Sequence, residues 1–148
     1  MTPALLVIAM AVAFAACNSD VPVTAVADMP GLGLQVSITR VATHPFLARF
    51  NLKLTVSTLE GCSTSSELFP DTGGVSRRHV YQGTMDRLYV VGEFDVRRFD
   101  LRGCRIELME FRSLEPGLQF VGAFDSDVSG RWSFLPADER PEQPFQRL

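Results

Sequence analysis

Lysine is nearly missing from this 148-residue chain, because Lys53 is the single lysine among fourteen basic residues. Acidic residues number seventeen, so the formal net charge at pH 7 is −3. A protein that binds nucleic acid without sequence preference needs a clear excess of positive charge to displace phosphate counterions. The composition therefore excludes a nonspecific nucleic-acid-binding protein, and we expect no nucleic acid among its partners.

The chain also lacks an apolar run long enough to cross a membrane as a helix. The run at residues 4–16 contains thirteen residues, whereas a membrane-spanning helix needs roughly 20. Its length suits the apolar core of a signal peptide, which is removed on export. We therefore expect residues 1–16 to be a signal peptide.

Ala15, Ala16 and Cys17 follow this apolar run and resemble the lipobox of bacterial lipoproteins, in which small side chains precede an acylated cysteine. The resemblance implies a palmitate-bearing lipid on Cys17, a membrane as partner and a place in the bacterial cell envelope. Asn18 is not the Asp that retains lipoproteins in the inner membrane of enteric bacteria, so the resemblance implies the outer membrane rather than the inner. The alternative is an ordinary small-x-small cleavage site at residues 13–15, which would release a soluble periplasmic protein.

Cysteine is scarce and odd in number, with only Cys17, Cys62 and Cys104 in the chain. An exported protein with three cysteines has one left over after a single disulfide. Acylation of Cys17 accounts for the odd one, so we predict a Cys62–Cys104 disulfide. It would close a loop of about 40 residues and stabilise the fold by roughly 4 kcal/mol.

Helical spacing is missing between Leu34 and Leu135, where apolar and polar residues alternate instead. Phe50, Leu52, Leu54 and Val56 are separated by polar residues, which is typical of a half-buried strand. Several such strands cannot bury their apolar faces in one layer. The pattern therefore predicts an all-β, antiparallel two-sheet β-sandwich, immunoglobulin-like or transthyretin-like, with a small barrel as the alternative.

The same patterns predict how the chain is divided. We expect a lipidated cysteine and flexible tether at residues 17–33, the β-sandwich at residues 34–135, and an extended, proline-rich tail at residues 136–148. Residues 59–74, rich in Ser, Thr and Gly, are predicted to form a long loop. Residues 88–96 are predicted to form one strand in which Gly92 marks a bulge, and residues 97–103 a connection.

Motifs of catalysis are sparse, since the chain has neither a Gly-x-Ser-x-Gly elbow nor a phosphate-binding glycine loop. Asp71-Thr72-Gly73 is the tripeptide of aspartic proteases, but Pro70 precedes it where that family has an apolar strand, so a plain turn is the favoured interpretation. His44 and His79 are the only histidines and could bind a metal or act as a general base only with further ligands or partners.

Asp125, Asp127 and Ser129 place oxygen side chains at alternate positions before Gly130, as the start of a calcium loop does. The position of the bidentate Glu is Pro136 instead, so the alternative is a polar hairpin loop. We therefore expect no cofactor, with calcium at this loop as the alternative.

Arg97, Arg98, Arg102 and Arg105 form a local cluster of positive charge in an acidic chain. Such a cluster could contact phosphates or acidic loops of a partner. The alternative is a solvated surface in which nearby carboxylates neutralise the arginines.

Three functional hypotheses follow. The first is a noncatalytic cell-envelope lipoprotein that binds an envelope protein or a cell-wall component through loops at one end of the sandwich. The second is a structural subunit of a trans-envelope complex, because residues 118–124 and Arg131-Trp132 resemble the end of the outer-membrane lipoprotein of type VI secretion. The third is an enzyme or a metal-binding protein, such as a calcium-binding β domain.

Overall fold

The computed structural model describes residues 21–145, which form ten β-strands and two short 3-10 helices and include no α-helix. No helix in this part of the chain has the length and apolar character to cross a membrane. The strands are β1 Val23–Met29, β2 Leu34–Ala42, β3 Phe50–Thr58, β4 Ser63–Glu67, β5 Arg78–Gln82, β6 Arg87–Val91, β7 Val96–Asp100, β8 Arg105–Met109, β9 Gln119–Ser126 and β10 Trp132–Pro136. The 3-10 helices are η1 Pro30–Leu32 and η2 Phe111–Ser113.

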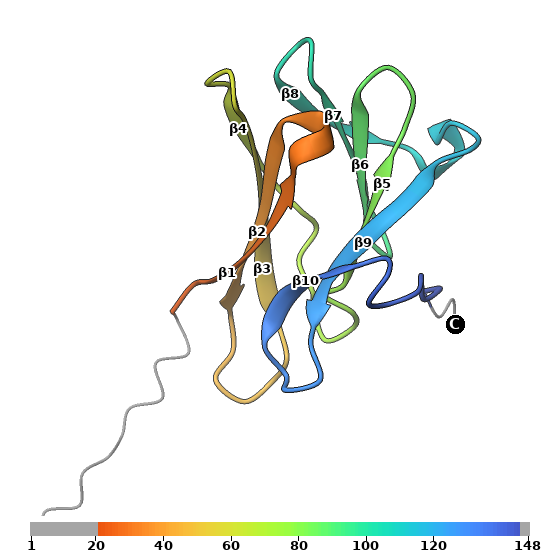
Figure 1. Ribbon diagram of the computed structural model, residues 1–148. Coiled ribbons are helices and arrows are strands. Elements are labelled where there is room, and N and C mark those ends of the chain that lie inside the picture. The colour runs from red at the N-terminus through yellow and green to blue at the C-terminus, as the bar shows by residue number, and fades with distance from the viewer. Residues whose placement is uncertain (1–20, 146–148) are drawn as a thin grey trace, which may run out of the picture.

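The strands form two antiparallel sheets that pack face to face (Figure 1). The first sheet has the order β1-β2-β3-β4, and the second has the order β10-β9-β5-β6-β7-β8. The sheets do not close into a barrel, so the predicted two-sheet β-sandwich is confirmed and the barrel alternative is wrong.

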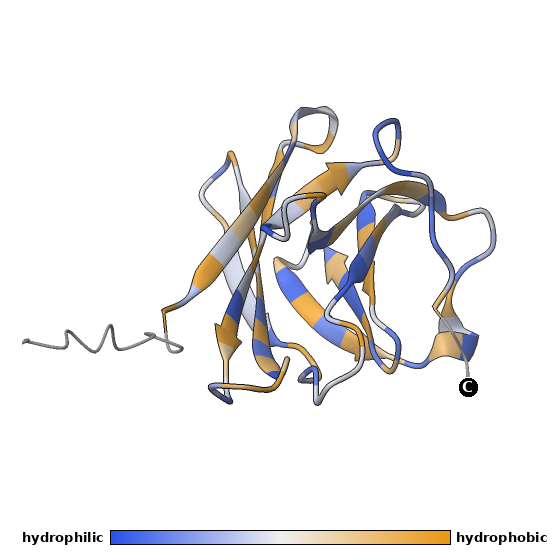
Figure 2. Cartoon of the chain, turned by 90° about the horizontal axis from the view of Figure 1, so that it is seen from below, coloured by the Kyte–Doolittle hydropathy of each residue, from blue (hydrophilic) through white to orange (hydrophobic). Residues whose placement is uncertain are grey.

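The core lies between the sheets because the period of two sends alternate side chains inward. Val36 and Ile38 of β2 and Leu54 of β3 are fully buried, while Gln35 before Val36 and Lys53 before Leu54 face solvent. The inner face of the second sheet contributes a second row of buried side chains to this core. Figure 2 shows the resulting alternation of apolar and polar residues along the strands. Burying each such aliphatic side chain stabilises the fold by roughly 1.5–3 kcal/mol.

The outer faces of the two sheets differ. The first sheet presents hydroxyl side chains to solvent, and cross-strand pairs such as Thr24 with Thr39 hydrogen-bond to each other. The second sheet carries a further apolar cluster on its outer face, around Tyr89, Val91 and Val96. Because β6 is covered on both faces, its sequence is a continuous apolar run rather than an alternating one.

The predicted disulfide is confirmed, with the Cα atoms of Cys62 and Cys104 lying 6.1 Å apart. Cys62 follows the turn after β3, and Cys104 lies in the turn between β7 and β8. The bridge therefore joins the two sheets at one end of the sandwich, the upper end in Figure 1.

The predicted division of the chain needs correction at both ends. Residues 23–29 of the expected flexible tether form strand β1, which pairs with β2 and buries Ala25, Ala27 and Met29. Two of these inward positions are alanines, which gave a weak apolar signal. The expected extended tail is also wrong in part, because Pro136 ends β10, residues 137–140 turn, and Phe145 packs on the second sheet.

Three predictions within the domain are also wrong. The expected loop at residues 59–74 contains strand β4, whose Ser- and Thr-rich sequence lacks an apolar face because it lies at a sheet edge. Residues 88–96 form two strands and not one, since residues 92–95 turn between β6 and β7. The expected connection at residues 97–103 is therefore mostly strand β7.

Candidate functional site

Four connections converge at the end of the sandwich opposite the disulfide. They comprise residues 43–49 between β2 and β3, residues 68–77 between β4 and β5, residues 92–95 between β6 and β7, and residues 127–131 between β9 and β10. We call these four segments the loop end, which is the lower end in Figure 1. The antiparallel order brings them together, because β2, β4, β6 and β9 all finish at this end.

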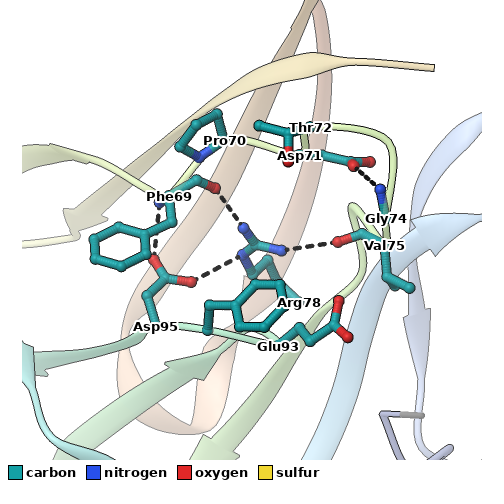
Figure 3. A pocket seen from close by; sticks show the side chains of 10 residues that line it. Phe69, Pro70, Asp71, Thr72, Gly74, Val75, Arg78, Glu93 and Asp95 are labelled. Carbon is teal, nitrogen blue, oxygen red and sulfur yellow. Dashed lines mark hydrogen bonds and ion pairs between the residues drawn. The ribbon is translucent and has the colours of Figure 1, made fainter. Parts of the chain in front are cut away.

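Arg78, the first residue of β5, organises the interior of the loop end (Figure 3). Its side chain is buried, with 3% of its surface exposed. Nη2 donates a 2.7 Å hydrogen bond to the carbonyl of Phe69, and Nη1 donates to the carbonyls of Ser76 at 3.1 Å and Val75 at 3.4 Å. One guanidinium therefore holds both sides of the 68–77 loop.

Asp95 is the buried counter-ion of this arginine. Its Oδ1 lies 3.6 Å from Nε of Arg78, and its Oδ2 accepts a 3.0 Å hydrogen bond from the amide of Phe69. Arg97 lies 3.9 Å from the same carboxylate and donates a 2.8 Å bond to the carbonyl of Glu67 in the first sheet. Burial lowers the pKa of Arg78, and the charges of Asp95 and Asp71 oppose that shift.

Gly92 is required where the turn between β6 and β7 passes this ion pair. A Cβ atom on Gly92 would lie 2.5 Å from Oδ1 of Asp95 and 2.7 Å from Nε of Arg78. Both distances are far below van der Waals contact. The turn can therefore approach the buried charges only because residue 92 has no side chain.

Asp71, the acidic residue of the Asp-Thr-Gly tripeptide, is a buried structural acceptor. Its Oδ1 accepts hydrogen bonds from the amides of Gly73 at 2.9 Å and Gly74 at 2.7 Å, and its Oδ2 accepts one from the hydroxyl of Ser76 at 2.6 Å. Its backbone pairs with Phe50 at the start of β3. These contacts are those of an Asp that stabilises a turn.

The cavity among these residues has a volume of about 30 Å³. That is room for about one water molecule, whereas small-molecule sites usually measure roughly 300–1,000 Å³. The buried charges therefore act as a scaffold that fixes the loops, and any recognition at this end takes place on the loop surface.

The surface of the loop end carries isolated apolar side chains. Phe46 is 90% exposed and Phe94 is 71% exposed, and Val128 at the tip of the β9–β10 hairpin is fully exposed. His44 fixes the first of these loops, because its Nδ1 accepts hydrogen bonds from the amides of Phe46 at 3.1 Å and Leu47 at 3.0 Å. These side chains were not among the candidate site residues predicted from the sequence, although single large apolar residues in otherwise polar loops were a visible signal.

His79 lies elsewhere, on the outer face of the second sheet beneath the C-terminal segment. Its Nδ1 is 3.2 Å from the hydroxyl of Tyr81, which donates a hydrogen bond to Glu142. Phe145 stacks on the imidazole with ring centroids 4.6 Å apart. Burial, with help from the charge of Arg77, lowers the pKa of His79 to about 4; burial and the hydrogen bond to Glu142 raise the pKa of Tyr81.

The structure does not bring the two histidines into one site, because His44 is in a loop of the first sheet and His79 is on the outer face of the second. Within residues 21–145, no group of three or more His, Cys, Asp or Glu side chains is placed to hold a metal ion.

The three residues of the suggested calcium loop have other partners. Asp125 forms ion pairs with Arg140 at 2.8 Å and Arg77 at 3.7 Å. Asp127 accepts hydrogen bonds from the amides of Ser129 and Arg131 and from the hydroxyl of Ser129, and these bonds lower its pKa to about 2. These contacts are those of a polar hairpin loop, and nothing in them favours calcium.

The expected arginine cluster is dispersed by strand β7. Arg97 points between the sheets and is buried, whereas Arg98 points outward and pairs with Glu107. Arg105 pairs with the same Glu107, and Arg102 is exposed in the turn. The four side chains therefore do not form one positive surface, because the period of two sends neighbours to opposite faces.

Cys17, the predicted lipidation site, lies outside the described residues. Comparison of the chain with protein-family models, with curated proteins and with solved structures finds no match.

Proposed function

We propose that this protein is a noncatalytic lipoprotein of the bacterial cell envelope, anchored through Cys17, that binds an envelope component through its loop end. Attachment to the outer membrane is favoured over the inner membrane by Asn18. The observation that carries the proposal is the loop end itself. There, buried charges fix four loops while large apolar side chains remain exposed.

The disulfide supports the export part of this proposal. A bridge between Cys62 and Cys104 that joins two sheets is typical of proteins folded in an oxidising compartment. It leaves Cys17 as the odd cysteine, in the position that a lipobox requires.

The loop end supports the binding part. Loops held by a rigid scaffold are common recognition surfaces, because little conformational entropy is lost when they bind. The guanidinium of Arg78 and the carboxylates of Asp95 and Asp71 provide that scaffold. Exposed phenylalanines then supply apolar contact area at low entropic cost.

Lipidation is tested by growing cells that express the full chain with an alkyne analogue of palmitate. We expect label on the wild-type protein and none on the Cys17→Ser variant. A wild-type chain without label overturns the anchor, and the protein would then be a soluble exported one.

Binding is tested by placing a photo-crosslinking amino acid at position 46 or at position 59 of the full-length chain. Leu59 is a matched control because it is 88% exposed but lies near the disulfide end. We expect crosslinks to envelope material from position 46 and not from position 59. Equal crosslinking from both positions would contradict recognition by the loop end.

A further inference from the structure

The exposed apolar side chains of the loop end lie on the side of the domain from which the predicted anchor departs. The described chain begins at Val21, and Val23 pairs with Arg40 just before the 43–49 loop. Val21 and Val23 are themselves about half exposed. The loops and the first described residues therefore share one end of the sandwich (Figure 1).

The covalent chain limits how far this end can move from the anchor. Val21 is only the fourth residue after Cys17, and a fully extended chain spans at most about 3.6 Å per residue, or roughly 14 Å here. The headgroup layer of a bilayer is itself roughly 5–8 Å thick. With acyl chains on Cys17, β1 would therefore begin at the membrane surface.

From these observations we infer that the loop end rests on the membrane that holds the lipid, with Phe46, Phe94 and Val128 inserted at the boundary of headgroups and acyl chains. The inference rests on the proposed lipid anchor and names the bilayer as the envelope component bound. Three protruding apolar side chains on fixed loops suit that boundary, where peripheral proteins place Phe and Leu side chains.

Charge at the loop end favours a bilayer over an acidic or basic partner. The exposed Arg131 is paired with Asp127, and the loops that carry Phe46 and Phe94, residues 43–49 and 92–95, contain a single Lys or Arg, which is Arg49. Polybasic recognition of anionic lipid needs several such residues. The loop end should therefore bind zwitterionic and anionic membranes to within twofold of each other.

The test places a fluorescent tryptophan probe at the loop end of the full-length, acylated protein. Phe46→Trp is compared with Leu59→Trp in vesicles of phosphatidylcholine and phosphatidylethanolamine that carry brominated acyl chains. Trp132 is buried in both variants and gives a constant background. We expect brominated lipid to quench the probe at position 46 at least threefold more than the probe at position 59. The emission of the position-46 probe should also shift to shorter wavelength.

Measuring the mass of the amino terminus on the same sample distinguishes failure of the membrane contact from failure of the lipid anchor. An acylated chain whose two probes are quenched equally overturns the inference and leaves the anchor standing. A chain without acyl groups overturns both. Shielding of the position-46 probe from acrylamide without quenching by brominated lipid also overturns the inference, because a protein or a second copy of the chain then covers the loop end.

Discussion

The indole N–H of Trp132 donates a 2.9 Å hydrogen bond to the backbone carbonyl of Ile38. Trp132 begins β10 in the second sheet and Ile38 lies in β2 of the first. The bond therefore joins the two sheets near the edge formed by β1 and β10. The guanidinium of Arg40 completes this contact, with its Cζ 4.7 Å from the Trp132 ring and 4.3 Å from that of Phe50. The disulfide links the sheets at the edge formed by β4 and β8, and this cluster links them at the opposite edge, formed by β1 and β10.

Replacement of Trp132 by Phe should therefore lower the free energy of unfolding by about 1–3 kcal/mol, because a buried hydrogen bond is lost while most of the aromatic area remains. Urea unfolding followed by far-UV circular dichroism measures this change without relying on the deleted fluorophore. Gln119→Ala at an exposed position of β9 is the control and should change stability by less than about 0.5 kcal/mol. Equal effects of the two substitutions would show that the indole bond contributes nothing.

The disulfide should contribute about 4 kcal/mol, because Cys62 and Cys104 are separated by 42 residues and the bridge restricts the unfolded chain. The double variant Cys62→Ser, Cys104→Ser should unfold at correspondingly lower urea concentration. Wild-type protein in reductant should match the variant, and reductant should leave the variant unchanged. A variant as stable as the oxidised wild type would contradict this account.

The sequence predicted the strands whose two faces differ. Leu52, Leu54 and Val56 bury their side chains as their alternation with polar residues indicated. The pattern did not indicate β1, where Ala25 and Ala27 face the core, because alanine carries little apolar signal. It also merged β6 and β7, since Gly92 looked like a bulge, whereas its amide donates a 2.8 Å hydrogen bond to the carbonyl of Asp95 and so begins a turn.

The same limit applies to the functional site. Asp71, His44 and Arg97 were candidates for chemistry because of their residue type, and each proved to hold a loop or a strand in place. Whether a polar side chain faces a loop amide or solvent depends on contacts between residues far apart in the chain. Sequence spacing alone does not contain those contacts.

Replacement of Asp95 by Asn should be the most damaging polar substitution at the loop end. It removes the charge that faces Arg78 and leaves both Arg78 and Arg97 buried without a counter-ion in contact. Breaking a buried pair in this way usually costs about 3–5 kcal/mol. Glu110→Gln, which removes the same kind of charge from the exposed pair with Arg112, should cost less than about 1 kcal/mol.

Urea unfolding of both variants checks this difference. If Asp95→Asn were no more destabilising than Glu110→Gln, the buried cluster would not be the scaffold of the loop end. Crosslinking from position 46 should also weaken in Asp95→Asn, because the neighbouring loops lose their anchor.

His79 should make the fold sensitive to acid. Its pKa is about 4 in the folded protein, against 6.5 for an ordinary histidine, because burial disfavours the imidazolium and Arg77 repels it. The unfolded chain therefore binds a proton first as the pH falls. The stabilisation of the folded state that comes from holding His79 neutral is complete above about pH 6.5 and is lost progressively between pH 6.5 and pH 4. It amounts to about 3 kcal/mol at most.

Tyr81, Glu142, Arg77, Arg140 and Asp125 face this histidine and titrate or carry charge, so the contribution of His79 must be isolated by difference. Between pH 7.5 and pH 4, the unfolding free energy of wild type should fall by up to about 3 kcal/mol relative to that of His79→Leu. Leu59→Ala, which replaces an exposed side chain that does not titrate, should run parallel to wild type.

Phe145→Ala provides the complementary test, because removing the stacked ring admits water to the imidazole. The pKa of His79, followed by NMR, should then rise from about 4 toward 6.5. An unchanged pKa would mean that the sheet itself, and not the C-terminal segment, keeps the imidazole neutral.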